Sequence, residues 1–273
     1  MKIKGNFMRE KFSYDKYLDF IEKDELEANK YKNQFIPDRL YKYQPIGSGQ
    51  MRAKRIQTIK KEQIWASRVK YLNDPFEFKM LYADQKNNNV REFYEDVLNR
   101  NEIICLSSKW NDKLMWAHYA ESHTGMCIEY AFLHGGKGQV TPVTYVANRQ
   151  CFDDELKVWL KNKNLALEQM LKQNEINGVQ RRQLHSCGKI MYTKDSVWKY
   201  EKEYRIVYPL DENSKGMNVP IHRLGMRTSR IVAGINCSED NKKKLNEISN
   251  SLGLGNVYTS RIHPEQYTID YVR

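Results

Sequence analysis

Two glutamates, Glu201 and Glu203, lie at the start of EYRIVYPL, the most strand-like segment of the chain. Residues i and i+2 of a strand lie on the same side of it, so both carboxylates are expected to project into one cleft. Carboxylates that lie close together shift each other's pKa values apart, which suits acid–base catalysis or the stabilisation of a developing cation. The alternative is a solvated sheet edge on which Lys199, Lys202 and Arg205 neutralise the two acids.

Aromatic and polar residues are mixed at unusual density in four short segments. These are LYKY at 40–43, LNDPFE at 72–77, LMWAHYA at 114–120 and WKYEKEYR at 198–205. A core segment tends to be uniformly apolar and a surface loop uniformly polar, whereas a small-molecule pocket needs flat rings together with a few orienting polar groups. The mixture therefore indicates a ligand pocket.

Three of the polar residues in these segments have two interpretations each. His118 is either a hydrogen-bonded core histidine or a catalytic base. Asp74 and Glu77 are either turn and cap residues or metal ligands. Asn73 or Asp74 would also be able to fix a ligand hydroxyl from a rigid turn.

The composition limits the class of protein. An apolar content of 40% with 12% aromatic residues is too high for a disordered chain of 273 residues. The sequence has no run of roughly 18 apolar residues and no apolar segment near its start, which predicts a cytoplasmic protein without a membrane partner. The five cysteines lack a CxxC spacing and the histidines lack zinc-ligand spacing, so reduced thiols and no metal are expected.

The formal net charge is +11. An excess of this size is typical of proteins that bind a polyanion, either a nucleic acid or a phosphate-rich small molecule. A solvated lysine-rich surface without such a partner is the alternative.

Hydrophobic periodicity predicts one α+β domain with about eight short strands. Strands are expected at 63–67, 102–108, 125–132, 139–146, 203–210, 217–221, 230–235 and 256–259. Helices are expected at 12–33, 88–100, 113–120 and 239–251, with a helical insertion at about 152–181. We expect residues 1–38 to form an N-terminal helical segment and residues 39–273 to form the α+β domain.

The four mixed segments, taken in order, resemble a bacterial family known as domain of unknown function 2971. Its members carry similar motifs, which correspond here to Leu40–Tyr43, Ile64–Glu77, Met115–Tyr130 and Trp198–Arg205. The resemblance spans about residues 39–208. The family name implies no activity.

A second resemblance is to ADP-ribosyltransferases. In many of these enzymes a glutamate that ends an E-x-E motif stands before an apolar strand, and Glu201-Lys-Glu203 looks like that arrangement. The resemblance implies a mixed, partly split β-sheet that grips NAD as a substrate. Tyr43 or Lys42 would take the position on the first strand of that fold, and Ser67 the position on the second.

The same resemblance implies roles for the site residues. Cleavage of the nicotinamide–ribose bond passes through an oxocarbenium-like cation, which Glu203 would stabilise while Glu201 activates the acceptor. The residues that would position NAD are Tyr43, Ser67, Asn73, His118 and Tyr119, with Arg205 or Lys42 at the pyrophosphate.

The expected acceptor is a nucleic acid or a protein. Free-standing bacterial transferases often act as toxins, so a toxin or anti-phage role with a possible antitoxin partner is expected. Two alternatives remain. One is a metal-dependent nuclease or nucleic-acid-binding protein, in which Asp74, Glu77 and Glu201 hold a divalent cation. The other is a non-catalytic sensor that binds a nucleotide in the same pocket.

Overall fold

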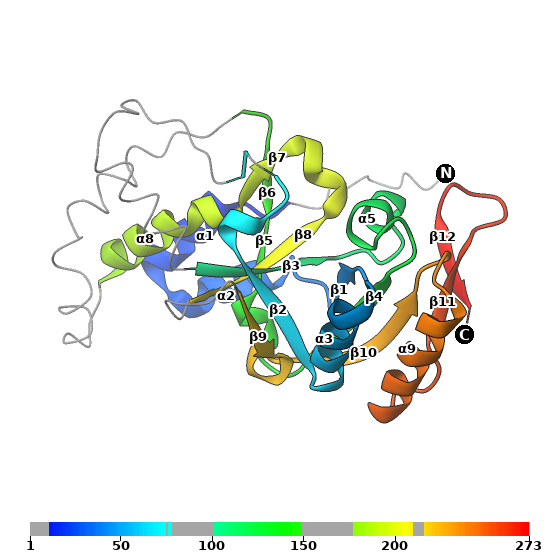
Figure 1. Ribbon diagram of the computed structural model, residues 1–273. Coiled ribbons are helices and arrows are strands. Elements are labelled where there is room, and N and C mark those ends of the chain that lie inside the picture. Colours follow the sequence, from blue (N-terminus) through cyan, green and yellow to red (C-terminus); the bar gives the residue numbers. More distant parts are fainter. Residues whose placement is uncertain (1–10, 75, 78–100, 149–176, 210–215, 273) are drawn as a thin grey trace, which may run out of the picture.

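The computed structural model describes residues 11–74, 76–77, 101–148, 177–209 and 216–272 (Figure 1). Over these residues the chain forms a large mixed β-sheet with helices packed against it, which confirms the α+β class. The expected helix at 88–100 and most of the expected insertion at 152–181 lie outside the described residues. In the described part of the chain, no helix combines the length and the apolar character that crossing a membrane requires.

The large sheet has ten strands within the described residues. Its main path runs β12 (Ile269–Val272), β11 (Tyr258–Ile262), β10 (Met226–Ala233), β4 (Met126–Phe132), β1 (Arg39–Gln44), β3 (Asn101–Ser107), β2 (Gln63–Arg68) and β9 (Gly216–Pro220). Off this path, β8 (Glu203–Pro209) pairs with β3 and with the short β5 (Thr141–Pro142). The β10–β11 pair is parallel and the other pairs are antiparallel, so the sheet is mixed.

The sheet opens at β3. Strand β8 pairs with β3 along its whole length, so β1 and β2 must share the other edge of β3. β1 pairs with β3 at Tyr41↔Ser107, and β2 pairs with it at Ser67↔Ile103 and at the next residue pair. Since both strands run antiparallel to β3 and neither pairs with residue 105, they diverge over the middle of β3.

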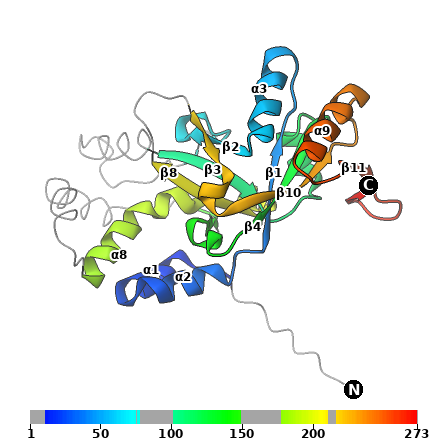
Figure 2. The same cartoon turned by 90° about the horizontal axis from the view of Figure 1, so that it is seen from below.

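Strand alternation separates two apolar clusters. On one face, Leu40, Ile104 and Ile128 join the main core, which α3 (Gly49–Lys60) and α9 (Glu239–Ser251) cover. Figure 2 shows α3 and α9 together on one side of β1, β4 and β10. On the other face, Tyr43 and Cys127 join a smaller cluster beneath α5 (Lys113–Tyr119).

The N-terminal helix expected over 12–33 is two helices, α1 (Tyr14–Lys23) and α2 (Glu25–Asn33). Asp24 has extended backbone, and its side chain accepts a hydrogen bond from the Glu27 amide, so it caps α2 and interrupts the helix. Tyr14 and Tyr17 of α1 pack with their neighbours in a third cluster, beside α8 (Gly178–Cys187).

The single strand expected over 139–146 is also wrong. The segment forms the end of a 3₁₀ turn (Gly136–Gln139), then β5, and then β6 (Thr144–Val146), which pairs with β7 (Thr193–Asp195) in a separate small sheet. Pro142 has no amide hydrogen to donate, so the ladder with β8 ends there and the chain changes partner.

Candidate functional site

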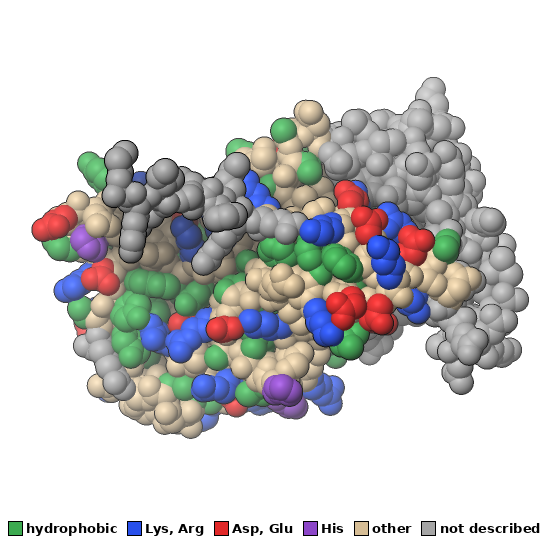
Figure 3. All heavy atoms as spheres, turned by 180° about the vertical axis from the view of Figure 1, so that it is seen from behind, with side chains coloured by type: hydrophobic (Ala, Val, Ile, Leu, Met, Phe, Trp, Pro, Cys, Tyr) green, Lys and Arg blue, Asp and Glu red, His purple; other side chains and the backbone are tan. Residues whose placement is uncertain are grey.

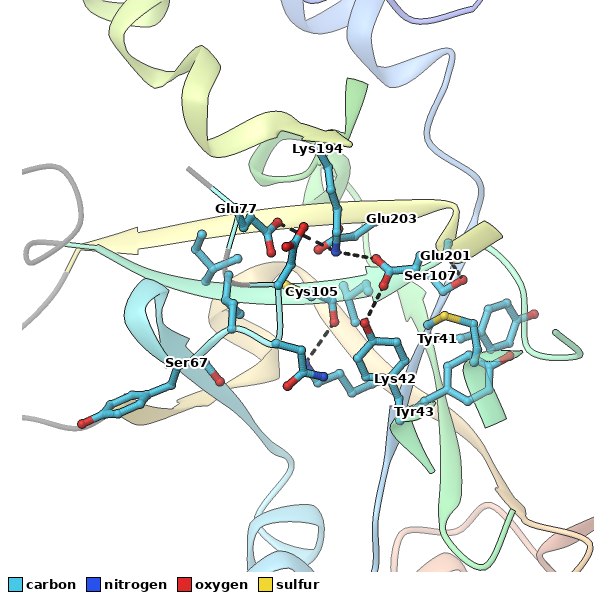
Figure 4. A pocket seen from close by; sticks show the side chains of 18 residues that line it. Tyr41, Lys42, Tyr43, Ser67, Glu77, Cys105, Ser107, Lys194, Glu201 and Glu203 are labelled. Carbon is cyan, nitrogen blue, oxygen red and sulfur yellow. Dashed lines mark hydrogen bonds and ion pairs between the residues drawn. The ribbon is translucent and has the colours of Figure 1, made fainter. Parts of the chain in front are cut away.

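A pocket of about 190 Å³ lies at the opening between β1 and β2. β1 contributes Tyr41, Lys42 and Tyr43, and β2 contributes Ser67 (Figure 4). Its floor is the odd-numbered face of β3, including Cys105. The sequence prediction of a pocket at the mixed segments is therefore correct in position.

Lys194 of β7 is the centre of the charged wall of this pocket. Its Nζ donates hydrogen bonds to Glu201 Oε2 at 2.6 Å and to Glu203 Oε2 at 3.2 Å, and lies 3.8 Å from Glu77 Oε1. Figure 4 shows the three carboxylates directed toward the Lys194 ammonium. The Trp198 ring lies 5.2 Å from the same nitrogen and shields it from solvent on another side.

Glu201 and Glu203 converge by a route that the alternation rule does not describe. Glu201 ends a 3₁₀ turn (Ser196–Glu201), Lys202 takes a left-handed conformation with φ of 48°, and only Glu203 belongs to β8. The prediction that both lie on one strand is therefore wrong, because the turn at Lys202 separates them. Lys194 brings the two carboxylates together.

The interpretation of the two acids as a solvated edge is also wrong. Glu201 and Glu203 are only 3% and 5% exposed. Lys199 and Lys202, the cations expected to neutralise them, are exposed, whereas Lys194 is buried between the acids.

Arg205 holds Glu203 from behind. Its Nε and Nη2 donate to the two carboxylate oxygens of Glu203 at 2.8 and 2.9 Å, and its Nη1 donates to the Met191 carbonyl. It also contacts Glu77. The Arg205 side chain is fully buried and is not among the residues that line the pocket, so it orients Glu203 and does not reach a pyrophosphate.

Tyr119 connects α5 to the acids. Its hydroxyl donates to Glu201 Oε1 at 2.5 Å, and its side chain lines the pocket. The helix is fixed beside the end of β1 by Gly125, where an added Cβ would lie 2.5 Å from the Gln44 carbonyl oxygen. His118, on the same helix, is exposed beside Tyr200 and does not line the pocket.

The other predicted positioning residues are at the pocket with different freedom. Lys42 Nζ donates to the Cys105 carbonyl, at the place where β1 and β2 leave β3 unpaired. The Tyr43 hydroxyl donates to the Lys109 carbonyl, so it supports a loop. Ser67 and Asn73 line the pocket.

Asp74 and Glu77 differ from each other. Asp74 Oδ1 accepts a hydrogen bond from the Phe76 amide, as the turn interpretation predicts. The Glu77 side chain is 2% exposed and contacts Lys194 and Arg205, so it belongs to the charged cluster. In the described ranges, no three His, Cys, Asp or Glu residues form a group suited to a metal ion.

The cluster has one carboxylate more than its two cations neutralise. Burial raises the pKa of Glu203, with Glu201 acting in the same direction and Lys194 opposing them. Burial alone would lower the pKa of Lys194, but Glu203 and Glu201 raise it above its ordinary value, so the ammonium stays charged. Burial, and then the Glu203 charge, raise the pKa of the Cys105 thiol, which makes it a poor nucleophile.

Lys194 is the important residue that sequence reasoning missed. It lies in the polar segment TKD, seven residues before Glu201, and no spacing rule connects it to the acids. Its position just upstream of WKYEKEYR is the only local signal, because the contact is made by a turn and by strand packing.

The model of a family described as "Protein of unknown function (DUF2971)" matches residues 115–206. This match confirms the resemblance to that family over a region that contains Tyr119, Lys194, Glu201, Glu203 and Arg205. No curated protein matches the chain, and no solved structure matches it.

Proposed function

We propose that the pocket binds NAD and that the protein cleaves its nicotinamide–ribose bond, transferring ADP-ribose to an acceptor. The observation that carries the proposal is the buried Glu203 carboxylate at the opening of the sheet, fixed by Arg205 through two hydrogen bonds. An ADP-ribosyltransferase requires such a carboxylate beside strands that spread apart around NAD. The divergence of β1 and β2 over β3 is consistent with that fold.

The chemistry follows from where charge develops. When the glycosidic bond breaks, nicotinamide leaves with the bonding electron pair and the ribose becomes an oxocarbenium-like cation. The excess negative charge of the cluster stabilises this cation. Arg205 fixes Glu203 in advance, so little reorganisation is needed during the reaction.

The second half of the reaction needs a proton acceptor. The nucleophile of the acceptor attacks the ribose carbon and releases a proton, which Glu201 takes up. Tyr119 and Lys194 each donate a hydrogen bond to Glu201, and they orient its two oxygens. The products are nicotinamide, the ADP-ribosylated acceptor and the proton.

The size of the pocket indicates which part of NAD it encloses. Its volume of about 190 Å³ is below the ~300–1,000 Å³ of pockets that bury a drug-sized ligand. We infer that it takes the nicotinamide ring and its ribose, while the adenosine half lies outside. Lys42, on β1 at the pocket wall, is the cation available to the pyrophosphate.

The contacts of the acids favour this chemistry over a metal-dependent nuclease. Asp74 caps a turn, and Glu77 and Glu201 face Lys194. A divalent cation held by these three residues would have to displace that ammonium. EDTA is therefore expected to leave the activity intact.

The test is incubation of the purified protein with NAD, with and without EDTA, while free nicotinamide is measured by mass spectrometry. The proposal predicts EDTA-insensitive release. A thermal shift with NAD but no product would contradict the enzyme and support a nucleotide sensor. Release that stops with EDTA and returns with a divalent cation would contradict the metal-free mechanism. If the protein is a toxin, expressing it should slow bacterial growth, and Glu203→Gln should relieve the effect.

A further inference from the structure

Outside the pocket, the face of β1, β4 and β10 opposite the main core carries an ordered group of arginines. Strand register places Arg39 and Arg227 on either side of Ala131, in one row across the three strands. Both arginines are exposed. Figure 3 shows the molecule from behind, where Lys and Arg side chains lie among hydrophobic ones.

The next row fixes the arginines in place. Glu129, which is 2% exposed, pairs across the strands with Tyr41 on one side and Arg230 on the other. Its Oε1 accepts hydrogen bonds from Arg39 Nη1 at 2.7 Å and from Ser229 Oγ at 2.7 Å, and lies 4.0 Å from Arg230 Nε. One buried carboxylate therefore holds two guanidinium groups, and the two rows keep an excess of positive charge.

Aromatic rings border these guanidinium groups. The Arg230 guanidinium carbon lies 4.6 Å and 4.8 Å from the ring centroids of Tyr258 and Tyr271. The Trp110 ring packs edge-on against Tyr271, with centroids 4.5 Å apart. Tyr41, Trp110, Tyr258 and Tyr271 are all half-buried, so part of each ring remains accessible.

The arginine-rich face continues into the pocket. Tyr41 belongs to the second row and also lines the pocket, beside Ser107 of β3. The outward side chains of β1 and the pocket-lining side chains of β3 lie on the same side of the sheet, away from the main core. A ligand on this face would therefore reach the pocket without crossing a strand.

We propose that this face binds a single-stranded nucleic acid and leads it to the pocket as the acceptor. Arginines that contact phosphates, next to rings on which bases stack, are the combination that single-strand-binding proteins use. Arg39 and Arg227 contact the phosphates, while Tyr41 and Tyr271 receive bases. Only the role of the strand as acceptor rests on the proposed function, because binding to the face requires no NAD.

The test measures binding of a short labelled single-stranded oligonucleotide by fluorescence anisotropy, without NAD. The double variant Arg39→Gln/Arg227→Gln is compared with Lys54→Gln/Lys243→Gln. The control removes the same charge from exposed residues of α3 and α9, which cover the other side of the sheet. The proposal predicts that the arginine variant binds about tenfold more weakly and that its salt dependence falls by about one ion. The control is expected to bind like the unmodified protein.

Equal losses in the two double variants would overturn the proposal, because net charge alone would then explain binding. Equally effective displacement by an acidic peptide or a duplex would also overturn it. Arg227→Gln alone leaves the Arg39–Glu129 pair intact and should weaken binding, so a folding defect cannot account for the result. Binding without any NAD cleavage would contradict the proposed enzyme and leave the docking face standing. Cleavage without binding would do the reverse.

Discussion

Arg205 binds both carboxylate oxygens of Glu203 through its Nε and Nη2, and both residues are buried on the same strand. Alternation on β8 places the two side chains on one face, so the arginine holds the acid from the side away from the pocket. A two-point contact of this kind fixes the plane of the carboxylate as well as its position.

Replacing Arg205 with Lys should therefore impair catalysis while keeping the charge. A lysine makes a single-point contact, so Glu203 would rotate and lose its alignment with the ribose. We expect kcat for nicotinamide release to fall by about tenfold or more, with a smaller change in KM for NAD. An equal loss from weaker NAD binding alone, with kcat unchanged, would show that Arg205 does not position the acid.

The pH dependence of the activity should report the environment of Glu203. The ionised carboxylate is the active form, and burial raises its pKa above the ordinary value of about 4.3. Activity should therefore fall as the pH decreases, with a midpoint above that value. Lys194 opposes the rise, so Lys194→Met should move the midpoint to higher pH. A midpoint that stays in place in this variant would contradict the electrostatic account.

The same substitution should lower stability in a pH-dependent manner. Removing Lys194 leaves buried carboxylates without their ammonium, which costs about 3–5 kcal/mol near neutral pH. A carboxyl whose pKa is raised in the folded state binds protons more tightly than in the unfolded chain. Its stabilising contribution is therefore present at low pH and lost as the pH rises through the raised pKa. Urea unfolding should show the smallest difference from the unmodified protein in acid, and a constant difference would contradict the assignment.

Tyr119→Phe isolates one hydrogen bond of the site. The variant keeps the ring and removes the hydroxyl that donates to Glu201. Because the acceptor is charged and buried, we expect unfolding to become easier by about 1–3 kcal/mol. The rate of transfer to an acceptor should fall more than the rate of nicotinamide release, since Glu201 acts in the second step. Equal effects on both rates would place Tyr119 in the cleavage step.

Sequence reasoning located the pocket because its signals are local. The mixed aromatic and polar segments mark β1, the 72–77 turn, α5 and the start of β8, and each has residues that line the pocket. It placed Arg205 in the wrong position, at a pyrophosphate, because a strand's neighbours are known from sequence but the side that its arginine faces is not. It missed Lys194 because that contact depends on how β7 packs against the turn before β8.

Helix and strand boundaries failed where one residue changed the path of the chain. Asp24 ends one helix and caps the next, which a continuous hydrophobic pattern does not indicate. Lys202 adopts the left-handed conformation although it is not a glycine, so the break between Glu201 and Glu203 has no sequence signal. The opening between β1 and β2 depends on long-range pairing with β3, and its presence in the sequence-based expectation came from the resemblance alone.

The most direct measurement of the central claim is the rate of nicotinamide release by Glu203→Gln. The matched control is Glu102→Gln, which changes another buried glutamate of the sheet, outside the residues that line the pocket. If Glu203 stabilises the developing cation, its variant should lose about 10²–10³-fold in kcat while the control retains activity. Unchanged release by a folded Glu203→Gln protein would contradict the proposed function.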